Sequence, residues 1–245
     1  MALYLIGIGL GSYKDVTLRG LEIIKKSEKI YLEEYTSRLT DSNKKELEEF
    51  YGKDIISADR DLVENKAGET ILKDAKETDA VFLVIGDPFS ATTHIGLRLR
   101  ADKLGIKTGV INNSSILSAI GITGIDLYKF GRTTTIPFEN KDVKSPYEVV
   151  KNNLKNNLHT LILLDLDPSQ DKYMTINQAL EYLLKQGISS EQLCVGCCQI
   201  GSSMPLIKAG KINDLLKSRF DRFPQCLIIP SKLHFMEEEV LKKWE

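Results

Sequence analysis

Short apolar runs alternate with stretches of helical periodicity through the first 111 residues, and this alternation constrains the fold more than any other feature. Strands that alternate with helices along a chain form a mostly parallel sheet with helices on its faces. Asp15 is expected to cap the first helix. The expected strands are residues 3–8, 29–32, 80–85 and 108–111, and the expected helices are residues 15–26, a charged surface helix around 47–51, residues 69–77 and residues 93–104.

The second half of the chain changes character, because a long polar helix rich in Lys and Asn separates its first two strands. We therefore expect an α/β protein with an N-terminal domain over residues 1–112 and a second α/β domain over residues 113–245. No Pro/Gly/Ser linker separates the halves, which predicts close packing. The expected strands are residues 130–137, 158–165, 193–200 and 225–230, and the expected helices are residues 175–185 and 212–219.

The charge is balanced, with 33 Lys and Arg against 34 Asp and Glu among 245 residues. This balance argues against a surface that grips nucleic acid or anionic membrane. No apolar stretch approaches the roughly 20 residues that a membrane helix needs, and the N-terminal segment does not have the pattern of a secretory signal. We expect a cytoplasmic protein that works at a localised site, with no direct nucleic-acid or membrane binding.

Three of the four cysteines lie close together, as Cys194, Cys197 and Cys198, and the fourth is Cys226. The Cys194-x-x-Cys197 spacing is compatible with a metal or redox pair, but no second pair or His-x-x-x-His accompanies it. The apolar density around these residues is typical of a buried strand, where a free thiol acts as a small hydrophobe. The sequence therefore favours core cysteines and no metal site.

Ligands of open α/β sheets bind at the strand ends, and three such ends are informative. Gly7-x-Gly9-x-Gly11 is either a cofactor loop or a simple turn, since it has no third glycine at the dinucleotide spacing. Asp87, between Gly86 and Pro88, needs a partner, either a ligand or a backbone amide. His94 is better explained by packing, while residues 112–115 form a polar turn that can both cap a helix and contact a ligand.

Several strings together resemble one family, the diphthine synthases, within the tetrapyrrole methylase superfamily. The glycine loop and Gly86-Asp87-Pro88 are shared with the wider superfamily. The more specific strings are Tyr35-Thr36-Ser37, Ala91-Thr92-Thr93-His94 and Tyr128-Lys129-Phe130-Gly131. The resemblance runs nearly from end to end of the chain.

The resemblance implies a two-domain methyltransferase, usually a homodimer, that binds S-adenosylmethionine in a cleft between its domains and releases S-adenosylhomocysteine. The substrate would be the modified histidine of translation elongation factor 2, whose 3-carboxy-3-aminopropyl amine is methylated. Three methyl groups give diphthine, and in eukaryotic relatives a fourth esterifies the carboxylate. Eukaryotic relatives tend to carry a long insertion in the segment that is short here, between Asp167 and Tyr173. The archaeal type of trimethylation is therefore expected, with the four-methyl type as the alternative.

The family's cofactor positions transfer to eight residues of this chain, and no catalytic residue or general base is assigned. Two departures concern the second half: relatives commonly have His where this chain has Gln225, and Ala-Arg where it has Cys198-Gln199. A backbone contact to the adenine would survive the first change. The eight positions are Leu10, Asp87, Ser90, Ser115, Ile116, Leu164, Ile200 and Gln225.

The aromatic side chains of Tyr35, Tyr128 and Phe130 are candidates to stabilise the growing ammonium by cation–π attraction.

Two other hypotheses about the function remain open. A Rossmann-type enzyme would use Glu33 or Glu34 on a ribose, about 24 residues after the glycine loop, near the spacing of about 20. A non-catalytic protein would bind the same elongation factor without methylating it.

Overall fold

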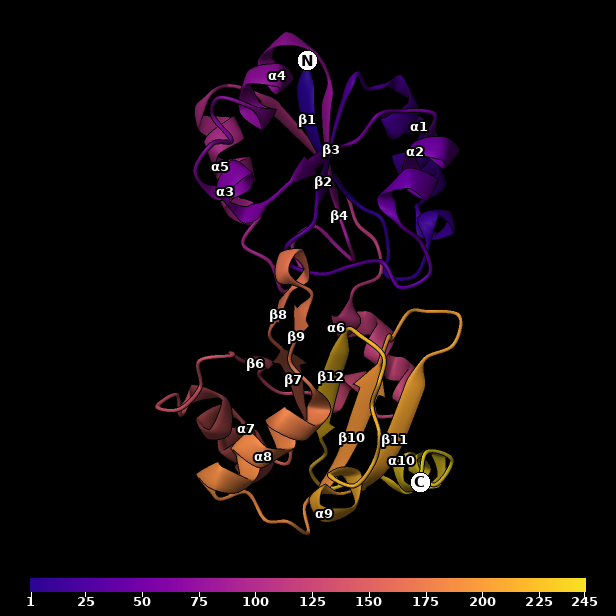
Figure 1. Cartoon of the computed structure of the whole chain (residues 1–245), viewed down its shortest axis with the longest axis vertical. Helices are drawn as coiled ribbons and strands as arrows, with labels where there is room; N and C mark the ends of the chain where they lie inside the picture. The colour runs from indigo at the N-terminus through magenta and orange to yellow at the C-terminus, as the bar shows by residue number, and fades with distance from the viewer. The chain divides into compact units, whose positions relative to one another are not determined.

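The computed structural model describes residues 1–245 and divides into two compact units, which we describe separately. The first unit comprises residues 1–116 together with 201–203, and the second comprises residues 117–200 and 204–245. Each unit has its own five-stranded sheet with helices packed against it (Figure 1).

The sheet of the first unit is entirely parallel, with the strand order β3-β2-β4-β1-β5. Leu3 of β1 pairs with Ala80 of β4, so the two central strands come from distant parts of the chain. All five strands therefore end at the same edge of the sheet. Their bounds are β1 Ala2–Gly7, β2 Lys29–Glu33, β3 Ile56–Ala58, β4 Ala80–Val84 and β5 Lys107–Ile111.

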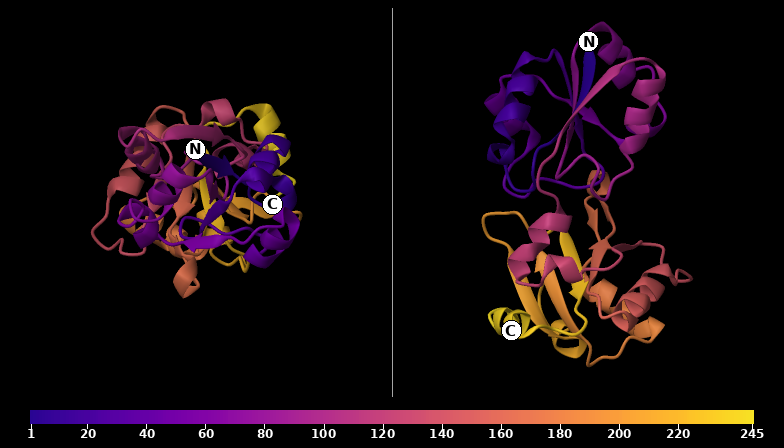
Figure 2. Two further views of the ribbon diagram at one scale, coloured as in Figure 1. Left: turned by 90° about the horizontal axis from the view of Figure 1, so that it is seen from above. Right: turned by 180° about the vertical axis from the view of Figure 1, so that it is seen from behind.

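Helices cover both faces of this sheet (Figure 2). Alternate residues of the strands face opposite ways, so Phe82 packs in one buried cluster with residues of α3, α4 and α5, while Leu83 packs in another with residues of α1 and α2. The helices are α1 Leu18–Lys26, α2 Lys44–Tyr51, α3 Arg60–Glu64, α4 Ile71–Glu77 and α5 Ile95–Lys103.

The first helix begins three residues later than the sequence predicts. Thr17 caps α1 by accepting a hydrogen bond from the Gly20 amide at 3.1 Å. Asp15 instead ends a short 3₁₀ turn, Tyr13–Asp15, and its carboxylate accepts from the amides of Gly11 and Ser12. The expectation that Asp15 caps the helix is therefore wrong, because the glycine loop supplies closer donors.

The second sheet has the order β11-β10-β12-β7-β6 and is mostly antiparallel, with only β6 and β7 parallel. A helix α6 (Ile116–Ala119) precedes it, and a two-stranded hairpin, β8 (Leu166–Asp167) and β9 (Lys172–Tyr173), extends from it. The remaining elements are β6 Thr134–Ile136, α7 Ser145–Lys155, β7 Thr160–Leu164, α8 Ile176–Gln186, β10 Leu193–Cys198, β11 Leu206–Lys211, α9 Ile212–Leu215, β12 Gln225–Ile229 and α10 Phe235–Leu241.

Two expected elements of this unit are shorter than predicted. The strand expected at residues 130–137 is confined to β6, since Phe130 makes only an isolated bridge with His159. The helix expected at residues 212–219 ends at Leu215.

All four cysteines are buried in the second sheet, as the sequence predicts. Cys194, Cys197 and Cys198 lie on β10, and Cys197 is directly opposite Cys226 on β12. No group of His, Cys, Asp and Glu side chains in the structure is arranged to hold a metal ion. Because Cys194 and Cys197 are both buried in β10, they are part of the core of the second unit.

Candidate functional site

The glycine loop after β1 is held against the loop after β4. Gly9 and Gly86 exchange backbone hydrogen bonds of 3.3 and 2.8 Å, and both have positive φ angles, which glycine adopts at little cost. A Cβ at Gly7 would lie 2.5 Å from the carbonyl oxygen of Gly86. These glycines therefore permit two backbone segments to approach where a side chain would not fit.

Asp87 joins the loop after β4 to the loop after β5. Its Oδ1 accepts from the Phe89 amide at 3.0 Å and the Ser90 hydroxyl at 3.2 Å. Its Oδ2 accepts from the Asn112 side chain at 2.9 Å and the Asn113 amide at 3.2 Å. Burial by itself raises the pKa of the Asp87 carboxyl. The four hydrogen bonds lower the pKa by more than burial raises it, so the pKa lies below the ordinary value.

The partner that Asp87 requires is thus supplied within the protein, by backbone amides and two side chains. The Asn113 side chain continues the network, since its Nδ2 donates to the carbonyls of Gly7 and Asp15 at 3.0 and 2.9 Å. The three strand-end loops singled out from the sequence therefore form one hydrogen-bonded group at the carboxyl ends of β1, β4 and β5.

Four of the five predicted cofactor positions in this unit gather in that group. Asp87 and Ser90 are hydrogen-bonded to each other. A Cβ at Gly86 would lie 3.5 Å from Cδ2 of Leu10 and 3.8 Å from Cα of Ser115, so these residues are neighbours as well. Ile116 follows directly, as the first residue of α6.

The three predicted positions of the second unit also gather, at one end of its sheet. Gln225 begins β12 opposite Cys198, the last residue of β10, and Ile200 follows two residues later. Cys226 pairs with Leu163, so Leu164 and Gln225 stand one step beyond that pair. Leu164, Ile200 and Gln225 are each 6% exposed.

The Gln225 side chain is engaged inside the second unit. Its Oε1 accepts from the Ile176 amide at 2.7 Å, at the start of α8, and its Nε2 donates to the carbonyls of Phe220 and Arg222. Both polar atoms of the Gln225 side chain are therefore engaged within the second unit. The Gln199 side chain is similarly engaged, because it donates to the Phe223 carbonyl at 3.0 Å.

Tyr35 and His94 form a pair at the carboxyl ends of β2 and β4. His94 is buried, with Nδ1 3.3 Å from the carbonyl oxygen of Pro88 and Nε2 3.3 Å from the hydroxyl of Tyr35. A carbonyl can only accept, so Nδ1 carries the hydrogen, and Nε2 of the neutral ring accepts from Tyr35. Burial lowers the pKa of His94 to about 4, which keeps the ring neutral near pH 7. The packing interpretation of His94 therefore needs this hydrogen-bonding role added to it.

The three aromatic candidates for cation binding are divided between the two units. Tyr35 belongs to the first unit, and the guanidinium carbon of Arg60 lies 5.3 Å from its ring centroid. Tyr128 of the second unit is 97% exposed, and Phe130 packs edge-on against His159. The Glu33 carboxylate accepts from Tyr35 and Thr36 of its own turn, so it is not free to bind a ribose.

A buried charged group that no local sequence pattern indicates anchors α10. Glu237 accepts hydrogen bonds from Lys129, from Nε2 of His159 at 3.1 Å, and from the amides of Asp126 and His234. These donors outweigh the effect of burial and lower the pKa of Glu237 to about 2. The partners lie up to 111 residues apart, so no local pattern could have revealed them.

Comparison with known proteins gives consistent matches. Residues 2–216 match the model of the tetrapyrrole (corrin/porphyrin) methylases. A protein named diphthine synthase from Methanocaldococcus jannaschii is 45% identical over 98% of this chain and 97% of its own length. The "probable diphthine methyl ester synthase" of Arabidopsis thaliana is 44% identical, over 98% of this chain and 97% of its own length.

A solved structure also matches. A crystal structure of a diphthine synthase superposes with a TM-score of 0.93 at 34% identity, and the match covers 100% of this chain and 96% of that chain. In the present structure, no helix is both long enough and apolar enough to span a membrane.

Proposed function

The chain belongs to the tetrapyrrole methylase family and, within it, to the diphthine synthases, and we propose on this basis that it trimethylates the 3-carboxy-3-aminopropyl-histidine of elongation factor 2. It is a methyltransferase of diphthamide biosynthesis, and the product would be diphthine. The observation that carries the proposal is the match to diphthine synthases over almost the whole chain, together with the hydrogen-bonded loops at the strand ends.

The methyl donor in this proposal is S-adenosylmethionine, which supplies an electrophilic methyl group on a sulfonium. The loops of the first unit fit such a ligand, because their glycines bring the backbone close and the Asp87 carboxylate holds the loops in place. We assign Leu10, Asp87, Ser90, Ser115 and Ile116 to the donor from the first unit. From the second unit we assign Leu164, Ile200 and the backbone of Gln225.

Methyl transfer from a sulfonium is an in-line displacement, so the protein's main task is to align two bound reactants. Alignment alone can lower the barrier by roughly 7–11 kcal/mol. The attacking amine must be neutral, which requires that it lose a proton to water or to an acceptor before each transfer. Three transfers are favoured because the β8–β9 hairpin is short, with only residues 168–171 between its strands.

Incubation of elongation factor 2 that carries the unmethylated side chain with S-adenosylmethionine tests the proposal, with intact mass as the readout. A gain of three methyl groups is expected. A gain of four would identify the methyl ester synthase type, and no gain would overturn the proposal. Titration calorimetry with S-adenosylmethionine distinguishes the proposed enzyme from a non-catalytic protein that only binds the elongation factor. Such a binder, having lost its cofactor site, would release no heat. Sedimentation velocity tests the homodimer that the family resemblance implies.

A further inference from the structure

The edge of the first sheet holds a second group of polar side chains next to the loops assigned to the methyl donor. Tyr35 follows β2, Arg60 follows β3, and His94 follows β4, and these strands are neighbours in the order β3-β2-β4. The donor loops follow β4, β1 and β5. The loop after β4 thus serves both groups, through Asp87 on one side and through Pro88 and His94 on the other.

Arg60 is positioned to bind an anion. Its guanidinium carbon lies over the ring of Tyr35, 5.3 Å from the ring centroid. Arg60 is exposed and takes part in none of the ion pairs of the structure. A guanidinium that lies on an aromatic face still directs its N–H groups outward, and their fork matches a carboxylate. The contact with the Tyr35 ring also lowers the entropy that Arg60 would lose on binding.

The hydroxyl hydrogen of Tyr35 is already donated in a hydrogen bond to His94. Because His94 accepts from the hydroxyl, the phenol oxygen keeps its lone pairs, and Tyr35 is only half-buried. Burial raises the pKa of Tyr35 to about 12, so the hydroxyl keeps its proton near pH 7. A cation therefore lies over the same ring that carries the acceptor oxygen.

We propose that Arg60 and Tyr35 bind the α-amino acid head group of the substrate side chain, with the carboxylate on the Arg60 guanidinium and the amine donating to the Tyr35 oxygen. This inference rests on the proposed function and adds the residues that recognise the substrate. The amine's lone pair attacks the methyl carbon and the carbon–sulfur pair leaves on sulfur. The amine then releases a proton to water before the next transfer.

The two contacts differ in a way that can be measured. The carboxylate is present through all three transfers, so the Arg60 contact should matter equally in each. The amine has an N–H to donate before the first and second transfers, but the neutral dimethylamine has none. Loss of the Tyr35 oxygen should therefore slow the first two transfers more than the third.

The test follows the three methyl additions over time by mass spectrometry in the full-length protein. Arg60→Met should raise the KM for the modified factor about 10- to 100-fold, as expected for a charged hydrogen-bonded contact, and Arg60→Lys should recover part of this loss. Tyr35→Phe keeps the ring under Arg60 and should slow only the first two additions about tenfold. Affinity for S-adenosylmethionine should stay unchanged in all three variants.

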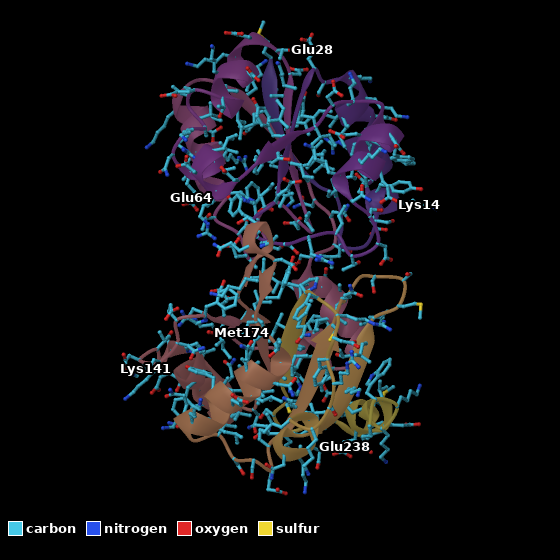
Figure 3. The ribbon with its side chains drawn as sticks, in the orientation of Figure 1. Lys14, Glu28, Glu64, Lys141, Met174 and Glu238 are labelled. Carbon is cyan, nitrogen blue, oxygen red and sulfur yellow. The ribbon has the colours of Figure 1, made fainter.

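Arg19→Met is the matched control, because Arg19 is an exposed arginine on α1, which covers the opposite face of the same sheet. Figure 3 shows these two flanks, with Lys14 just before α1 on one side and Glu64 at the end of α3 on the other. Arg19→Met should behave as the unaltered protein does.

An unchanged KM in Arg60→Met, or equal slowing of all three additions in Tyr35→Phe, would overturn the inference. If the unaltered protein adds no methyl group, the proposed function fails. The head-group site is then judged by calorimetric binding of the modified factor. Arg60→Met must weaken that binding about tenfold, and must leave any binding of the unmodified factor as it was; equal binding of the modified factor by both proteins overturns the site.

Discussion

The side-chain amide of Asn112 donates to Oδ2 of Asp87 over 2.9 Å, so a residue that follows β5 holds the carboxylate that follows β4. Neighbouring parallel strands end at one edge of a sheet, and ligands bind there when the loops keep a defined shape. Asp87 gives that shape by accepting four hydrogen bonds. Its importance thus comes from the loops that it joins as much as from any direct contact with a ligand.

Asp87→Ala should therefore lower both stability and affinity for the methyl donor. Removing the carboxylate leaves four donors without their acceptor, which should cost about 2–3 kcal/mol of unfolding free energy and reduce affinity for S-adenosylmethionine at least tenfold. Denaturant unfolding and titration calorimetry measure the two effects. Asp79→Ala is the control, because Asp79 lies just before β4, at the opposite edge, and accepts from the Ala2 amide. Unchanged cofactor affinity in Asp87→Ala would contradict the role given to these loops.

The elements with long, clear periodicity could be predicted from the sequence, and the strand β4 and the helix α8 fall close to their expected bounds. The three-residue β3 and the five-residue α3 could not be predicted, because elements this short do not show a recognisable hydrophobic periodicity. The antiparallel β11 was missed for another reason. Strand direction and pairing depend on contacts far along the chain, which local patterns do not contain.

The residues of the candidate site likewise divide into those that the sequence predicts and those that it does not. The loops after β1, β4 and β5 were identified from the sequence, because glycine, proline and buried acids have strict local requirements. The partners of those residues were not, since Asn112 lies 25 residues from Asp87 and Arg60 lies 25 residues from Tyr35. Only the sheet order brings them together.

Gly7→Ala should destabilise the protein and weaken cofactor binding. The new Cβ would lie 2.5 Å from the Gly86 carbonyl oxygen and 3.0 Å from Cβ of Asn113, so the loops after β4 and β5 would have to shift. We expect a loss of roughly 1–3 kcal/mol, as for other overpacked sites. Gly96→Ala, in α5 with no neighbour within 4 Å of the new Cβ, should instead stabilise by about 0.5–1 kcal/mol. Equal melting temperatures for the two variants would contradict this account.

Gln225→Met should reduce stability and leave cofactor affinity nearly unchanged. The substitution removes the acceptor of the Ile176 amide and the donor to Phe220 and Arg222, at a cost of about 1–3 kcal/mol for the buried groups left unpaired. The backbone assigned to the cofactor is retained. Calorimetry with S-adenosylmethionine, well below the melting temperature, should give a dissociation constant within about threefold of the unaltered protein, which is under 1 kcal/mol. A larger loss would mean that the side chain contacts the cofactor.

The cysteines should be inert in the folded protein. Burial raises the pKa of both Cys194 and Cys198 to about 12, so almost no thiolate is present at pH 8. Alkylation with iodoacetamide, followed by peptide mass spectrometry, should leave all four cysteines unmodified under native conditions and modify all four in denaturant. Rapid native labelling of any of them would show that the β10–β12 region opens, in conflict with its place in the core.

Glu237→Gln should destabilise the second unit and change how its stability depends on pH. The variant leaves Lys129 and His159 without the carboxylate, and breaking such a buried ionic contact costs about 3–5 kcal/mol. In the folded protein the pKa of Glu237 is about 2, below the ordinary value of 4.5. Its stabilising contribution is thus complete above about pH 4.5 and is lost as the pH falls toward 2.

Burial also lowers the pKa of His159, with Lys129 acting in the same direction, which adds a loss of stability on acidification that begins at higher pH. Denaturant unfolding at a series of pH values should therefore show a steep decline below pH 4.5 that is weaker in Glu237→Gln. Glu239→Gln is the control, since Glu239 is exposed on the same helix, and its stability should stay within about 0.5 kcal/mol of the unaltered protein. Parallel pH curves for the unaltered protein and Glu237→Gln would show that the ionised Glu237 does not stabilise the fold. The anchoring of α10 would then have to be attributed to its apolar contacts.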